Sequence, residues 1–154
     1  MRPNAQMKEA FEFFKKKQFQ QVIDSQYCSL DEAIIYSIES YMYPDSLKDS
    51  LPALRKNLQL VFEKNSLKFK QSMANCFIDC ENLYTIIWDS ITDFTVTSDS
   101  TSVIINNFQY AMYPAVVHFQ YKKEKYNWAI EGYVRTASGR FRILDKKIIF
   151  TKEL

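Results

Sequence analysis

Two segments near the C-terminal end of the chain alternate apolar and polar residues, and a short charged stretch joins them. The segments are Ala115 to Tyr121 and Tyr126 to Thr136, and the stretch that joins them is Lys122-Lys123-Glu124-Lys125. A period of two residues is typical of a β-strand with one buried face. Because so short a connection can join only antiparallel neighbours, the pattern predicts a hairpin and requires a fold that contains an antiparallel sheet.

The turn sets the register of this hairpin. If Lys123 and Glu124 form a two-residue turn, one face carries the opposed pairs Phe119 with Trp128, Val117 with Ile130, and Tyr121 with Tyr126. Aromatic and β-branched pairs of this kind stabilise a buried face. The opposite face then carries Val116, His118, Gln120, Asn127, Ala129 and Glu131.

A second hairpin follows, with Ser138 and Gly139 as its turn. Its apolar face pairs Thr136 with Phe141 and Val134 with Ile143, and its other face pairs Tyr133 with Leu144, Glu131 with Lys146, and Arg135 with Arg142. The two hairpins agree on which face is apolar, although neither register depends on the other. A like-charged cross-strand pair such as Arg135 with Arg142 costs stability unless an acidic group relieves it.

The N-terminal half has the periodicity of helices. Apolar residues form one stripe over residues 4–26, and Ser29-Leu30-Asp31-Glu32 is a capping box for a second helix that ends near Pro44. Asp49 or Ser50 caps a third helix, which Asn65-Ser66 ends or bends. Residues 67–93 fit helix and strand patterns alike, and a strand within 84–97 is favoured.

Further strands are predicted over Thr101 to Gln109 and Arg140 to Phe150. Helices first and sheet second predict an α+β fold, with about three N-terminal helices on one face of a curved antiparallel sheet. Residues 1–154 are expected to form a single domain, with a helical part over about 4–80 and a sheet part over about 84–150.

Composition excludes several classes of site. The chain has two glycines and one histidine, so it contains no GxGxxG, P-loop or GxSxG motif and no His-rich metal centre. Its three cysteines, Cys28, Cys76 and Cys80, form no disulfide framework, which favours reduced thiols and a cytoplasmic location. No apolar stretch is long enough for a membrane span and no signal peptide is visible, although a leader removed earlier would leave the same sequence.

The order of elements resembles the nuclear transport factor 2-like, or cystatin-like, superfamily of α+β cones. The residues that carry this resemblance are the aromatic-rich opening segment 9–23 and the closing segments 128–134 and 139–144. The resemblance implies a pocket between sheet and helices and frequent dimerisation through the sheet. Members of the superfamily include isomerases, dehydratases, transport adaptors and binding domains, so the resemblance leaves the function open.

Three titratable residues are candidates for acid–base catalysis. Asp89 and Asp93 lie among apolar residues, where desolvation would raise the pKa of a carboxyl group, and they are the general-base candidates of an isomerase or dehydratase. His118 is the single histidine, but the predicted register turns it away from the interior. Solvated carboxylates and a solvated or interface histidine are the favoured interpretation of all three.

Two further groups of residues resemble functional sites, but a structural role is the favoured interpretation of both. Cys28, Cys76, Cys80 and His118 have the residue types of a Cys3His zinc site but lack the close CxxC pairs that such sites use, so no metal and no cofactor are predicted. Tyr110, Met112 and Trp128 could line a pocket for a small apolar ligand, but core packing is the favoured interpretation of their spacing.

Charge is distributed unevenly along the chain. Residues 110–154 hold nine Lys and Arg against four Asp and Glu, whereas residues 1–109 are net acidic. A basic sheet favours a partner with an acidic surface or a second copy of the chain over a nucleic acid, for which no motif is present. The sequence therefore predicts a non-enzymatic protein-interaction module. Its binding surface is the outer sheet face, formed by Val116, His118, Gln120, Glu131, Tyr133, Arg135, Arg142 and Leu144.

Overall fold

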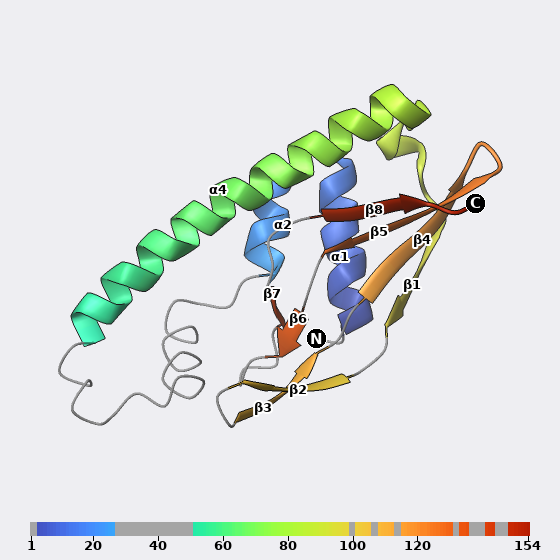
Figure 1. Cartoon of the computed structure of the whole chain (residues 1–154). Helices are drawn as coiled ribbons and strands as arrows, with labels where there is room; N and C mark the ends of the chain where they lie inside the picture. Colours follow the sequence, from blue (N-terminus) through green and yellow to red (C-terminus); the bar gives the residue numbers. More distant parts are fainter. Residues whose placement is uncertain are drawn as a thin grey trace.

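The computed structural model describes residues 3–26, 51–98, 101–105, 108–112, 115–130, 133–135, 141–143 and 148–154. Its helices are α1 (Pro3–Lys15), α2 (Phe19–Gln26) and α4 (Leu51–Tyr84), followed by a 3-10 turn, η2 (Trp88–Ser90). The strands are β1 (Phe94–Ser98), β2 (Thr101–Ile105), β3 (Phe108–Met112), β4 (Ala115–Tyr121), β5 (Glu124–Ile130), β6 (Tyr133–Arg135), β7 (Phe141–Ile143) and β8 (Ile148–Lys152). The predicted α+β class is confirmed (Figure 1). The second predicted helix and Cys28 lie outside the described residues.

The single helix predicted over residues 4–26 is broken in the structure. Lys17 adopts a left-handed conformation with φ 59°. The amides of Lys17 and Gln18 donate to the carbonyls of Phe14 and Phe13 at 3.0 Å each, which is a Schellman C-cap. The break turns the chain so that the Phe19 ring packs 5.8 Å from the ring of Phe14.

The third helix is longer than predicted. α4 has 34 residues and continues past Asn65-Ser66, so the expected end at that point and the strand alternative for residues 67–73 are both wrong. Phe69, Met73, Phe77 and Cys80 are buried at helical spacing, and this burial stabilises the second half of α4. Thr85, with φ 54°, follows the last helical residue.

The strands form two sheets instead of one meander. The first has the order β1-β4-β5-β8 and the second β2-β3-β6-β7, and every pairing is antiparallel, as predicted. Each of the three long strands predicted at 101–109, 126–136 and 140–150 corresponds to two shorter strands. β5 ends at Ile130 in the first sheet, and β6 begins at Tyr133 in the second. The alternation in the sequence therefore runs across the point where the chain passes from one sheet to the other.

The register of the β4–β5 hairpin differs from the prediction by two residues. The turn is Lys122-Lys123, with φ values of 48° and 68°, and not Lys123-Glu124. Phe119 therefore lies opposite Tyr126, and Val117 opposite Trp128. A shift of two residues keeps every side chain on its face, so the predicted inner face is still correct: Val117, Phe119, Tyr126, Trp128 and Ile130 are all buried.

The register of β6 and β7 differs by one residue. Arg135 lies opposite Phe141, and Arg142 opposite Val134, so the predicted Arg135–Arg142 and Val134–Ile143 pairs are wrong. A shift of one residue exchanges the two faces of a strand. Ser138 and Gly139, the predicted turn, lie outside the described residues.

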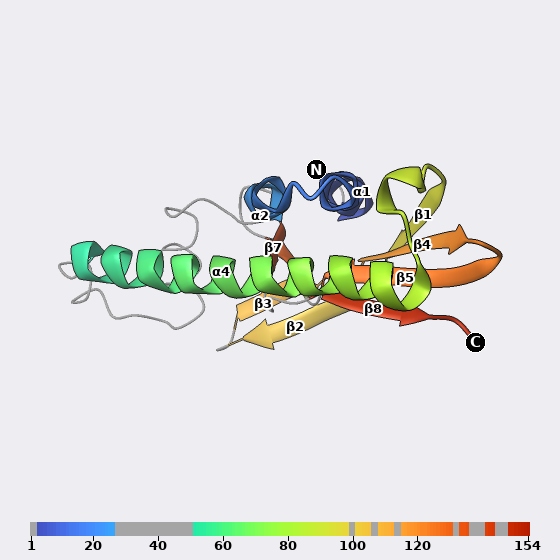
Figure 2. The ribbon, with the colours of Figure 1, turned by 90° about the horizontal axis from the view of Figure 1, so that it is seen from above.

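Helices cover one face of the β1-β4-β5-β8 sheet (Figure 2). Between them the aromatic residues form a continuous cluster in which the Phe11 ring lies 5.1 Å from Trp128 and the Phe14 ring 5.0 Å from Trp88. Trp88 also donates from Nε1 to the Phe77 carbonyl at 3.2 Å, which joins η2 to α4. Edge and tilted contacts between these large rings fill the layer between the helices and the sheet. They hold the strands in place, and with the strands the opposite face of the sheet.

Candidate functional site

The outward face of the β1-β4-β5-β8 sheet is covered by no helix in the described part of the chain. Its side chains are half-buried or exposed, and the register arranges them in three rows across the strands. From the hairpin end, the rows are Asp93, Gln120, Lys125 and Glu153; then Thr95, His118, Asn127 and Thr151; then Thr97, Val116, Ala129 and Ile149. We call these residues the outward face. It is charged at the hairpin end and apolar at the other.

Hydrogen bonds between side chains connect all four strands at the centre of the outward face. His118 Nε2 lies 2.7 Å from Thr97 Oγ1, and His118 Nδ1 lies 2.6 Å from Asn127 Oδ1. Asn127 Nδ2 donates to Thr151 Oγ1 at 3.4 Å. These contacts hold the polar side chains in one arrangement, so the face is ordered before any partner arrives.

The network assigns a tautomer to His118. Asn127 uses its Nδ2 group on Thr151 and therefore presents Oδ1, an acceptor, to Nδ1 of the imidazole. The proton of a neutral ring thus lies on Nδ1, and Nε2 accepts from the Thr97 hydroxyl. Thr97, His118 and Asn127 have the sequence of contacts found in nucleophile–base–orienter triads. The main-chain amide of Thr97 lies within the β1–β4 ladder, where it is not positioned as an oxyanion donor.

A shallow concavity of about 400 Å³ lies over the hairpin end of the outward face. Its lining includes Asp93, His118, Gln120, Lys125 and Glu153. The neighbouring turn adds the exposed Lys122 and Lys123, and Lys152 pairs with Glu124 at 3.8 Å. Charges of both signs thus meet around a hollow in an open sheet.

The predicted binding residues that the structure describes are divided between the two sheets. Val116, His118 and Gln120 lie on the outward face as predicted. Tyr133, Arg135 and Arg142 belong to β6 and β7 of the second sheet. Glu131 and Leu144 lie outside the described residues. The sequence pattern missed Thr97, Thr151 and Ile149 on this face, because nothing in their spacing indicated that β1 and β8 flank the hairpin.

The predicted catalytic and pocket residues lie apart from one another. Asp89 and Asp93 are exposed, in agreement with the favoured interpretation of solvated carboxylates and not with the apolar surroundings that a general base would need. Trp128 is fully buried in the aromatic cluster. Tyr110 and Met112 are in β3, in the second sheet.

Cys80 is buried and Cys76 half-buried in the core that α4 forms with the inner face of the sheet, whereas His118 belongs to the outward face. A hydrogen bond with Cys80, burial and the charge of Asp79 raise the pKa of the Cys76 thiol. Within the described residues no three His, Cys, Asp or Glu side chains form a group that could hold a metal ion.

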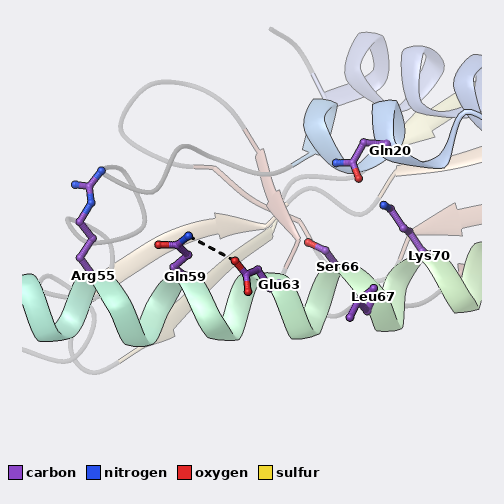
Figure 3. A pocket seen from close by; sticks show the side chains of 7 residues that line it. All are labelled: Gln20, Arg55, Gln59, Glu63, Ser66, Leu67 and Lys70. Atoms are coloured by element: carbon purple, nitrogen blue, oxygen red, sulfur yellow. Dashed lines mark hydrogen bonds between the residues drawn. The ribbon is translucent and has the colours of Figure 1, made fainter.

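A second hollow, of about 680 Å³, lies between α4 and α2 (Figure 3). It is bordered by Gln20 of α2 and by Gln59, Glu63 and Lys70 of α4, among others. Gln59 donates to Glu63 at 3.5 Å, and Lys70 points toward Gln20. This groove lies beside the exposed side of α4, on the helical side of the molecule, whereas the outward face belongs to the other side of the sheet.

Of the helices described, none is both long and apolar enough to cross a bilayer. Comparisons of the chain with protein-family models, curated proteins and solved structures found no match to any of them.

Proposed function

We propose that this chain is a protein-interaction module that binds a protein partner through the outward face. The observation that carries the proposal is the hydrogen-bonded network of Thr97, His118, Asn127 and Thr151 across a sheet face that no described helix covers. The network faces solvent, and the apolar side chains of Val116, Ala129 and Ile149 lie beside it on the same face. Protein interfaces combine an apolar core with a polar rim, and both kinds of surface meet on this face.

The partner that fits best has an acidic surface. Three exposed lysines of the hairpin, Lys122, Lys123 and Lys125, lie at the hairpin end of the face and outnumber its two acidic residues, Asp93 and Glu153. Arg135 and Arg142 do not lie opposite each other, so the repulsion predicted between them gives no reason to expect an acidic partner. Complementary charge would steer such a partner toward the hairpin end, while Val116 and Ile149 supply the apolar contact.

The alternative, an isomerase or dehydratase with its site between sheet and helices, finds less support. Phe11, Phe14, Trp88 and Trp128 occupy that layer and are almost completely buried. The two candidate carboxylates, Asp89 and Asp93, are exposed. Both observations favour the interaction module over the enzyme.

The test compares two variants of matched chemistry. Val116→Glu with Ile149→Glu places negative charge on the apolar end of the outward face, and Leu83→Glu alters an exposed leucine of α4 away from this face. Each chain is used as bait in cross-linking and affinity purification from cells that produce the protein. Proteins captured by the wild type should be lost from the double variant and retained by Leu83→Glu, and at least one should present an acidic surface.

Two outcomes would overturn the proposal. The first is that the wild type captures nothing beyond an unrelated bait. The second is that the double variant captures the same proteins as Leu83→Glu while both have the circular dichroism and melting temperature of the folded protein.

A further inference from the structure

The solvent side of α4 carries an apolar stripe that no described element covers. Ala53, Leu60, Leu67 and Ala74 are seven residues apart, and Ile78 extends the line. Leu60 is 56% exposed, Leu67 68% and Ile78 54%. Because the opposite side of α4 buries Phe69, Met73 and Phe77 against the core, this helix has two apolar sides where a surface helix needs one.

Charged residues accompany the stripe along one flank. With about 3.6 residues per turn, Lys56, Glu63, Lys70 and Glu81 fall on the same side of the stripe, and their signs alternate. Glu63 and Lys70 border the groove between α4 and α2, where there is room beside the helix (Figure 3). An exposed apolar stripe with charges of both signs beside it is a surface that a complementary helix can cover.

We propose that α4 pairs with α4 of a second copy in antiparallel orientation, centred on Leu67. In that register Leu67 of one protomer meets Leu67 of its partner, and Leu60 meets Ala74, so that a large side chain faces a small one. The flanks complement each other as well: Lys56 lies near Glu81 of the second copy, and Glu63 near Lys70. The two-fold axis repeats both pairs, giving four interhelical ion pairs.

The charges select the orientation. In a parallel pair the two-fold axis runs along the helices, so the flank with Lys56, Glu63, Lys70 and Glu81 would face the opposite flank of the other copy and these ion pairs could not form. In the antiparallel pair the axis is perpendicular to the helices, and the two charged flanks meet.

This pairing is independent of the proposed function. The stripe lies on α4, and the outward face is formed by the strands, so each copy in the dimer keeps its own outward face open (Figure 1). The failure of one proposal therefore leaves the other to be tested by different variants.

The first test is the molar mass of the full chain by light scattering over a range of concentrations. The wild type is expected to be dimeric, and Leu67→Glu, which sets two carboxylates against each other at the centre, should raise the dimer dissociation constant by at least about tenfold. Leu83→Glu is the matched control, because Leu83 is an exposed leucine of α4 outside the stripe. It should leave the dissociation constant unchanged.

The second test identifies the orientation. Glu63→Lys should weaken the dimer about five- to tenfold, because both of its pairs with Lys70 become repulsive. The exchanged variant, Glu63→Lys with Lys70→Glu, should restore the wild-type constant to within about threefold. Restoration is expected only if these two positions meet across the antiparallel pair.

Several results would overturn the proposal. They are a wild type that remains monomeric at every concentration, a dimer that Leu67→Glu leaves intact, and an exchanged variant no tighter than Glu63→Lys. A monomeric wild type that binds vesicles of anionic lipid would likewise overturn it and assign the stripe to a membrane surface.

Discussion

The two faces of the β1-β4-β5-β8 sheet are built from alternate residues of the same strands, yet they serve different ends. The inner face presents Val117, Phe119, Tyr126 and Trp128 to the helices, and all four are buried. The outward face presents Thr97, His118 and Asn127, which bond to one another. The comparison shows that apolar area stabilises one side of the sheet, whereas hydrogen bonds order the other side without burying it.

The largest expected difference between the faces is in stability. Trp128→Ala should lower the free energy of unfolding by about 3–5 kcal/mol, because it leaves a cavity beside Phe11 and Phe14. Thr151→Ala, on the outward side of the neighbouring strand, should change it by about 0.5 kcal/mol or less. Urea unfolding followed by circular dichroism measures both. Equal losses for the two variants would contradict the division of roles.

A smaller effect is expected from the outward network. His118→Ala removes two short hydrogen bonds on a solvent-facing surface and should cost about 1 kcal/mol of folding free energy. A double-mutant cycle with Asn127→Ala should give a coupling of at least about 0.5 kcal/mol, since the two side chains are in contact. Additive losses would show that the network does not act as a unit.

The smallest effect concerns alkaline pH. Burial, followed by the charge of Glu124, raises the pKa of the Tyr126 phenol. The folded state therefore holds this proton more tightly than the unfolded state, whose tyrosines titrate near a pH of about 10. Stability associated with Tyr126 is complete below that pH and is lost as the pH rises above it. Over this range the free energy of unfolding should fall less with rising pH for Tyr126→Phe than for the wild type. Identical pH dependence would show that the phenol is not held protonated by folding.

The sequence predicted the β4–β5 hairpin and its buried face because alternation depends on side-chain polarity, which is local. It did not predict the turn. Lys122 and Lys123 both take positive φ, a conformation that favours Asn or Gly in such turns, so the residues gave no signal. The register follows from the stacking of Tyr126 on Phe119 and Phe150, whose rings lie 5.5 Å away in each case.

The candidate surface could be predicted only in part for a related reason. Val116, His118 and Gln120 share a strand, and their common face follows from the period of two. Thr97 and Thr151 reach the same face from strands that are distant in the sequence, and their pairing depends on which edge of the hairpin each strand joins. The expected Arg135–Arg142 pair was wrong because the register was inferred from an assumed turn, and the two strands pair one residue away from it.

The sequence by itself determined the α+β class, the antiparallel pairing, the helical start and the inner face of the hairpin, since each depends on local periodicity. Only the tertiary structure decided how the strands divide between two sheets, where α4 ends, and which side chains meet His118. Those features depend on contacts between residues far apart in the chain, such as the bond from the Ile148 amide to Ser72 Oγ at 2.9 Å. No local pattern encodes contacts of that kind.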